Sequence, residues 1–153
     1  MVSLAGTDRM PMAAALLGFA GALPFVFFAG ALWLPPPFPS VPFAFSGGLV
    51  YGAVILSFLG GIRWGTALGM GEGEHRSMTF AVSVLPALAG WVALALPPLL
   101  GVGLLIASFL LQAQWDVISV EQGRLPAWFG KLRMLLTAAA VLSLLAMLLR
   151  LVI

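Results

Sequence analysis

Three polar side chains recur on one face of an otherwise apolar stretch in the second half of the chain. Ser108, Gln112 and Asp116 are spaced four residues apart, so on a helix they project from the same side. Lipid cannot satisfy polar or charged groups, and the stripe should therefore face protein or a water-filled cavity. The chemistry open to such a stripe is charge pairing, proton handling or the binding of a polar ligand group.

Arg63 is the cation that we expect opposite Asp116. Counted at 1.5 Å per residue from the outer ends of their helices, Arg63 lies about 27 Å deep and Asp116 about 26 Å deep. We predict an ion pair between them, with a further hydrogen bond from Gln112. Such a pair could be a structural clamp or could handle a ligand or proton, and the alternative that the two groups do not touch stays open.

Five apolar stretches, each long enough to cross a bilayer, must position these residues. A hydrocarbon core of about 30 Å requires roughly 20 apolar residues in a helix. The connections between the stretches are too short to build a soluble core. We therefore predict an all-α membrane protein, a five-transmembrane-helix bundle that forms a single domain over residues 1–153. The predicted spans are 12–34, 45–68, 78–96, 99–116 and 133–152.

The composition agrees with a membrane protein and excludes several other classes. Hydrophobic residues make up 62% of the chain and charged residues 8%, whereas about a quarter of the residues in soluble domains are charged. Without cysteine, disulfides, iron–sulfur clusters and thiolate metal sites are excluded. The few charges indicate no nucleic-acid role. Glu72, Glu74 and His75 lie among glycines without a fixed geometry, so we predict no metal site and no cofactor.

The distribution of cations predicts the orientation. Cationic side chains near the span ends face the cytoplasm. The N-terminus and the two loops that share its side hold six of the seven Lys and Arg residues, and the other side holds only Arg150. The N-terminus should therefore lie inside and the C-terminus outside. The first span is longer than a signal-peptide core of 7–15 residues, so we expect a retained anchor.

Small residues on the second span predict close helix packing. Glycines recur at intervals of four residues on two sides of this helix, which allows neighbouring backbones to approach. We expect the helix to be central and packed within the chain, with a homodimer as the alternative. These glycines are Gly48, Gly52, Gly61, Gly65 and Gly69.

Prolines and aromatic residues mark the span ends. Pro24 and Pro86 should kink their helices, the Pro35–Pro42 segment should be an extended link, and Pro97-Pro98 should leave two helices as antiparallel neighbours. Indoles and cations favour the membrane interface. The predicted anchors at the inner ends are Trp64, Trp115, Trp128, Lys131 and Arg133.

Four segments resemble one protein family. They are residues 51–65, 83–88 and 110–116 and the Leu-Pro-Ala-Trp-Phe run at 125–129, and Leu-Ser-Phe-Leu-Gly-Gly within the first is the most specific. The chain resembles the domain-of-unknown-function family 3429, the transmembrane protein 69-like family. The resemblance implies a multi-pass protein of the bacterial inner (cytoplasmic) membrane or the mitochondrial inner membrane, without established activity or catalytic residues.

The sequence offers little support for catalysis. It has no nucleophile-elbow motif, no histidine on a span and no phosphate-binding loop, so we predict that the protein is not an enzyme. An interaction or assembly role fits best, with membrane lipids and other membrane proteins or a second copy as partners. The alternatives are a carrier or sensor for a small hydrophobic molecule, such as a quinone or lipid, and an oligomeric transporter.

Overall fold

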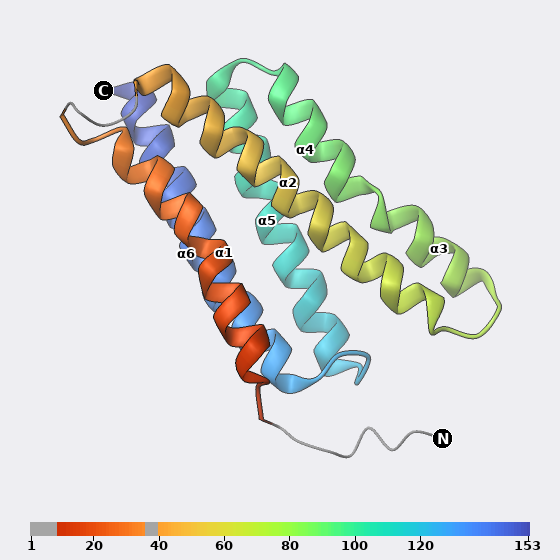
Figure 1. Ribbon diagram of the computed structural model, residues 1–153. Coiled ribbons are helices and arrows are strands. Elements are labelled where there is room, and N and C mark those ends of the chain that lie inside the picture. The colour runs from red at the N-terminus through yellow and green to blue at the C-terminus, as the bar shows by residue number, and fades with distance from the viewer. Residues whose placement is uncertain (1–8, 36–39) are drawn as a thin grey trace.

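Every regular element of the described chain is a helix. The computed structural model describes residues 9–35 and 40–153, and Figure 1 shows the helices side by side with their axes roughly aligned. The helices are α1 (Met12–Ala31), α2 (Val41–Leu68), α3 (Glu74–Ser83), α4 (Leu85–Ala95), α5 (Pro98–Glu121) and α6 (Ala127–Val152).

Within residues 9–35 and 40–153, five helical stretches are long and apolar enough to cross a membrane, which confirms the predicted span number. The third stretch combines α3 and α4 over Glu74–Ala95. Four helices begin earlier than expected, at Val41, Glu74, Pro98 and Ala127, and the difference at Pro98 is a single residue. At α3 the helix continues into polar residues such as Glu74 and Arg76, which hydropathy does not detect. At α2 the helix includes Val41 and Pro42, which the proline-rich sequence predicted to be part of an extended link.

Proline acts differently in the two spans that contain it. Near Pro86, helix α3 ends at Ser83 and α4 begins at Leu85, so the predicted interruption is present. Pro24 instead lies inside α1, which continues to Ala31. The predicted Pro35–Pro42 link is tested only in part, because residues 36–39 lie outside the described chain; Pro42 belongs to the first turn of α2.

Helix α2 occupies the centre of the bundle, as its glycines predicted. It contacts every other helix, while α1 also packs against α6, α6 against α5, and α5 against α4. Gly48 and Gly52 make room for neighbours: a Cβ at Gly48 would lie 2.5 Å from the Met147 methyl, and one at Gly52 would lie 2.9 Å from Leu105 Cδ1. These two glycines allow α6 and α5 to approach.

The closest backbone contacts involve glycines outside the predicted set. A Cβ on Gly60 would lie 2.4 Å from the Ser83 carbonyl oxygen, and one on Gly101 would lie 2.5 Å from the Ala93 carbonyl oxygen. One on Gly90 would lie 2.9 Å from Ala53 Cα. These contacts explain how α4 fits between α2 and α5.

Three of the predicted packing glycines have no such neighbour. A Cβ at Gly61 or Gly65 would meet nothing within 4 Å, and one at Gly69 would meet only the Thr66 carbonyl oxygen of its own helix turn, at 3.6 Å. The expectation that these glycines pack within the chain is therefore wrong. They lie on the exposed face of α2 because the opposite face is the one that carries Gly60 and Arg63 into the bundle.

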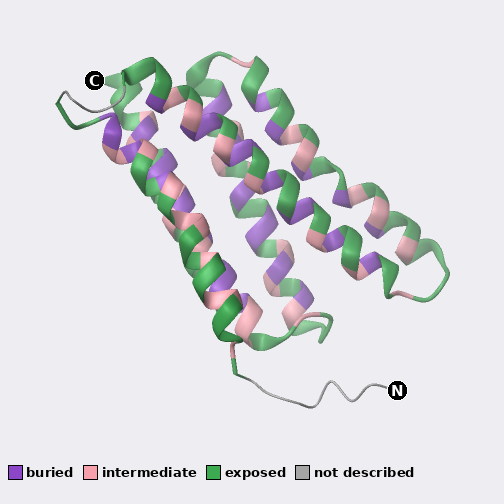
Figure 2. Cartoon of the chain, viewed as in Figure 1, coloured by how far each residue is buried: buried purple, intermediate pink, exposed green. Residues whose placement is uncertain are grey.

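The outer surface is apolar, as a lipid-facing surface requires. Figure 2 shows buried residues on the facing sides of the helices and exposed residues on the outward sides. Many exposed side chains are large and hydrophobic, including Leu17, Phe58 and Trp91. A water-soluble monomer rarely exposes contiguous apolar surface of this extent. The packing therefore agrees with the composition.

Candidate site: a buried charged cluster

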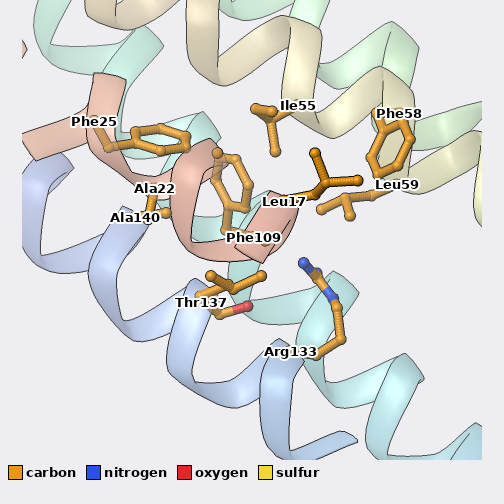
Figure 3. Close-up of a pocket in the computed structure, with 13 residues that line it drawn as sticks. Leu17, Ala22, Phe25, Ile55, Phe58, Leu59, Phe109, Arg133, Thr137 and Ala140 are labelled. Carbon is orange, nitrogen blue, oxygen red and sulfur yellow. The ribbon is translucent and has the colours of Figure 1, made fainter. Parts of the chain in front are cut away.

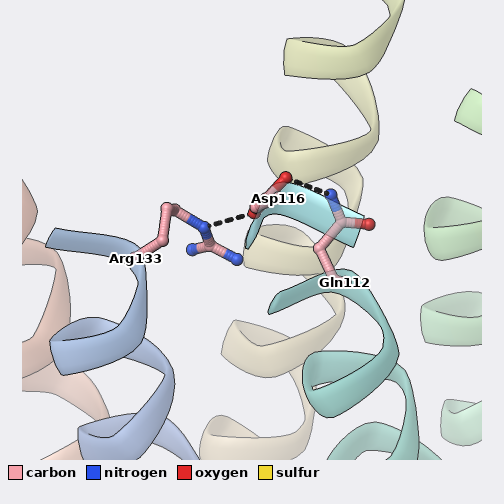
Figure 4. A network of polar contacts seen from close by, with 3 residues as sticks. All are labelled: Gln112, Asp116 and Arg133. Carbon is pink, nitrogen blue, oxygen red and sulfur yellow. Dashed lines mark hydrogen bonds and ion pairs between the residues drawn. The ribbon is translucent and has the colours of Figure 1, made fainter. Parts of the chain in front are cut away.

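A buried ion pair joins α5 to α6. Arg133 Nε lies 2.7 Å from Asp116 Oδ2, and both side chains are more than nine-tenths buried. Gln112 Nε2 donates to Asp116 Oδ1 at 3.5 Å, the long limit of a hydrogen bond. Figure 4 shows the carboxylate held between these two side chains. The predicted polar stripe thus faces protein at Gln112 and Asp116.

Arg63 does not form the predicted ion pair with Asp116. Its guanidinium carbon instead lies 4.3 Å from the centre of the Trp115 ring, a cation–π contact. The expectation that Arg133 is an interfacial anchor is also wrong, because only 5% of it is exposed. Since α6 begins at Ala127, Arg133 lies well inside the helix, where its side chain contacts Asp116 in place of Arg63.

Two cavities bring the predicted polar residues together. One of about 410 Å³ is lined by Arg63 and Asp116, with Ser119 and Trp115. Another of about 360 Å³ is lined by Arg63, Trp115, Gln112 and Ser108. Arg63 therefore contributes to both cavities, and Ser108 is half-buried in the second one. The predicted cluster of Arg63, Ser108, Gln112 and Asp116 is a real spatial grouping, although its ion pair involves a different arginine.

Comparison with known proteins identifies the family. Residues 10–149 match the family model described as "Protein of unknown function (DUF3429)". The chain belongs to the DUF3429 family. Transmembrane protein 69 of Xenopus tropicalis is 35% identical to the DUF3429 chain over 147 residues, which cover 88% of this chain and 53% of that protein. The chain thus spans about half the length of this curated relative. No solved structure matches it.

The DUF3429 chain leaves several buried polar atoms around this cluster without a hydrogen-bond partner in its described part. A buried polar group left unpaired costs about 1–3 kcal/mol, so such atoms are rare in proteins and are places where a water, an ion or a ligand can bind. The unpartnered atoms are Arg63 Nε, Gln112 Oε1, Arg133 Nη2 and Thr137 Oγ1. In addition, the two guanidinium groups of Arg63 and Arg133 face a single carboxylate.

Thr137 was not predicted, and Arg133 was assigned a different role. The two are four residues apart on α6 and share the face that meets α5. This spacing was a usable signal, because an arginine and a threonine one turn apart form a polar patch on an apolar helix. It was missed because Arg133 follows Lys131, and two neighbouring cations at a span end are typical of the interface.

The other predicted anchors lie near the same end of the bundle in the DUF3429 chain. Trp64 is exposed and packs edge-on against Phe80, with ring centres 4.8 Å apart. Trp128 is half-buried and Lys131 is exposed. Among the described residues, no group of three or more His, Asp or Glu side chains could hold a metal ion.

Proposed function

We propose that this DUF3429 chain is a non-enzymatic accessory protein of the bacterial inner membrane that associates with another transmembrane helix through α2. The partner is a second membrane protein or a second copy of the chain. The contact would use the exposed face that carries Gly61 and Gly65. The contrast among the glycines of α2 supports this proposal.

Four glycines of α2 allow close contact with another helix of the chain, and two do not face any other helix. A Cβ at Gly47, Gly48, Gly52 or Gly60 would lie within 3 Å of another helix, whereas one at Gly61 or Gly65 would meet open space. Glycine in a helix costs about 1 kcal/mol relative to alanine. Small residues four apart offset that cost by letting two helices approach. A partner helix would supply at Gly61 and Gly65 the contact that the chain itself does not.

Leucine at both open glycines should abolish the association without disturbing the fold. The variant Gly61→Leu with Gly65→Leu fills space that is empty in the bundle. We expect native mass spectrometry of gently solubilised membranes to show the partner or dimer with the unaltered chain and to lose it with the variant. The matched control is Gly103→Leu on α5, where a Cβ also meets nothing within 4 Å.

The control should leave the association intact. If the double variant retains the same complexes as the unaltered chain, α2 is not the contact. Purification of the unaltered chain with neither a partner nor a second copy would contradict the accessory role as a whole.

The second candidate is a carrier or sensor for a small hydrophobic molecule such as a quinone or lipid. The two cavities beside Arg63 favour it, because sites for small molecules combine an apolar wall with a few polar groups. The same native spectra would report a retained molecule of fixed mass. If Arg63→Met abolishes that species while the protein complexes persist, the molecule binds beside Arg63 independently of helix association. A retained molecule in a chain purified with neither a partner nor a second copy would favour the carrier role over the accessory one.

The proposed orientation places the N-terminus in the cytoplasm and the C-terminus outside it. In Figure 1 the link from α2 to α3 and the link from α5 to α6 lie toward the end of the bundle where α1 begins, and the C-terminal end of α6 lies at the opposite end. Arg63, Arg76, Arg124 and Arg133 are in or near those two links in the chain, whereas Arg150 is in the last turn of α6. A reporter active only in the periplasm should be active when fused after Ile153, and one active only in the cytoplasm should not. The reverse result would invert the topology.

A further inference from the structure

A third cavity carries two unpartnered polar groups that the proposed function does not use. It encloses about 130 Å³ between α1, α2, α5 and α6. Its walls are apolar except on α6, where Arg133 and Thr137 contribute (Figure 3). On the walls opposite lie side chains such as Leu17, Phe25 and Phe109. An apolar cavity of about 150 Å³ can hold a molecule the size of benzene.

Both polar groups are buried and have hydrogen-bonding capacity to spare. Arg133 and Thr137 are each 5% exposed. Nε of Arg133 is bonded to Asp116, but its Nη2 has no hydrogen-bond partner among residues 9–35 and 40–153, and neither has Thr137 Oγ1. Figure 3 shows the guanidinium directed into the cavity. An unmet donor and a hydroxyl on one helix face suit a ligand with acceptor oxygens.

The balance of charge favours an anionic ligand. Arg63, Arg133 and Asp116 are the buried charged side chains of the described chain, so two guanidiniums lie near one carboxylate and one positive charge is in excess. Arg63 lines the two other cavities, and Arg133 is the cation that reaches this one. Buried charge in a membrane is costly unless it is paired. Arginine pairs best with carboxylate or phosphate, and the small volume suits a carboxylate better than a phosphodiester flanked by glycerol.

The cavity is accessible from the lipid, because residues at its rim are also exposed on the outer surface of the bundle. Leu17 on α1 and Phe58 on α2 line it and are largely exposed on the outer surface, at 74% and 66%. In Figure 1, α1 and α2 diverge toward the end where α1 begins. A hydrocarbon chain could therefore extend from the cavity into the bilayer without exposing apolar surface to water.

We propose that this cavity binds the carboxylate end of a single-chain membrane amphiphile, such as a long-chain fatty acid. Arg133 and the Thr137 hydroxyl would hold the carboxylate, and the chain would leave between α1 and α2. This site is separate from the glycine face proposed for helix association, so either can fail without the other.

The test uses a photoactivatable fatty acid with the full chain in phosphatidylcholine nanodiscs. We expect saturable labelling that maps to the lining residues of α1, α2, α5 or α6. Oleate should compete, and oleyl alcohol, which lacks the charge, should compete at least about tenfold more weakly, as expected for a charged hydrogen bond. Equal competition by the alcohol, labelling that never saturates, or adducts confined to other helices would overturn the proposal.

Two variants that keep the ion pair locate the site. Thr137→Val preserves shape and removes the hydroxyl, and should weaken labelling about tenfold. Ala22→Phe fills the cavity from α1 and should abolish labelling. Ser143→Ala is the control, because it removes a buried hydroxyl of α6 that does not line the cavity. Labelling of both test variants at the level of the unaltered chain would also overturn the proposal.

Discussion

Asp116→Leu is expected to destabilise this protein more than any other single change in the charged cluster. The buried charges of Arg63, Asp116 and Arg133 sum to +1 in the unaltered chain, and removing Asp116 raises that sum to +2. Breaking a buried ion pair costs about 3–5 kcal/mol because one charge is left uncompensated. Here two guanidiniums lose the carboxylate. The measurement is the thermal unfolding midpoint in detergent.

Removing the other member of the ion pair, Arg133, should cost less stability than removing Asp116. Arg133→Met reduces the charge sum to zero and leaves Asp116 lining the same cavity as Arg63, which can move toward it. The double variant Asp116→Leu with Arg133→Met restores the sum of +1 and should recover most of the stability lost by Asp116→Leu, because removing a whole buried pair is often neutral.

The same series tests the identity of the partner of Asp116. Gln112→Leu is the control, since its hydrogen bond is long at 3.5 Å and its loss should have a small effect. If Arg63→Met were as destabilising as Asp116→Leu, and Arg133→Met were not, the ion pair between Arg63 and Asp116 would be the correct one.

Gly60→Ala should be strongly destabilising, whereas Gly61→Ala should not. A Cβ at Gly60 would lie 2.4 Å from the Ser83 carbonyl oxygen, which is backbone and cannot rotate away. The two helices would have to separate, and overpacking of this kind costs about 1–3 kcal/mol or more. At Gly61 the Cβ meets nothing within 4 Å, so alanine should stabilise the helix by up to about 1 kcal/mol.

The adjacent positions make this a matched pair, because the residue change, the helix and the depth are nearly the same. Unfolding midpoints of the two variants should move in opposite directions. Equal losses would mean that the close approach of α2 to the break between α3 and α4 is not what makes glycine necessary.

Residue spacing predicted some of the glycine contacts but could not assign them to partners. The recurrence of Gly48 and Gly52 correctly indicated close packing and a central α2. The same spacing at Gly61 and Gly65 led to an incorrect expectation of packing within the chain. A helix has several faces, and the spacing of residues along it does not say which faces are covered.

In the charged cluster, too, the sequence predicted which residues are buried but not which residues they contact. The polar stripe of α5 had to face protein, because lipid cannot solvate Gln112 and Asp116. That Arg133 and not Arg63 pairs with Asp116 depends on where α6 begins and how it is rotated against α5.

Hydropathy, proline and the distribution of cations depend on each residue's own interaction with lipid, water or backbone, so the sequence by itself determined the five apolar helices and the interruption near Pro86. Ion-pair partners, open glycine faces and the cavity beside Arg133 and Thr137 depend on the relative rotation and approach of helices distant in the chain. Only the tertiary structure decided these features. The rotation of each helix is set by the simultaneous packing of many side chains from several helices, and no short segment of the sequence encodes that rotation.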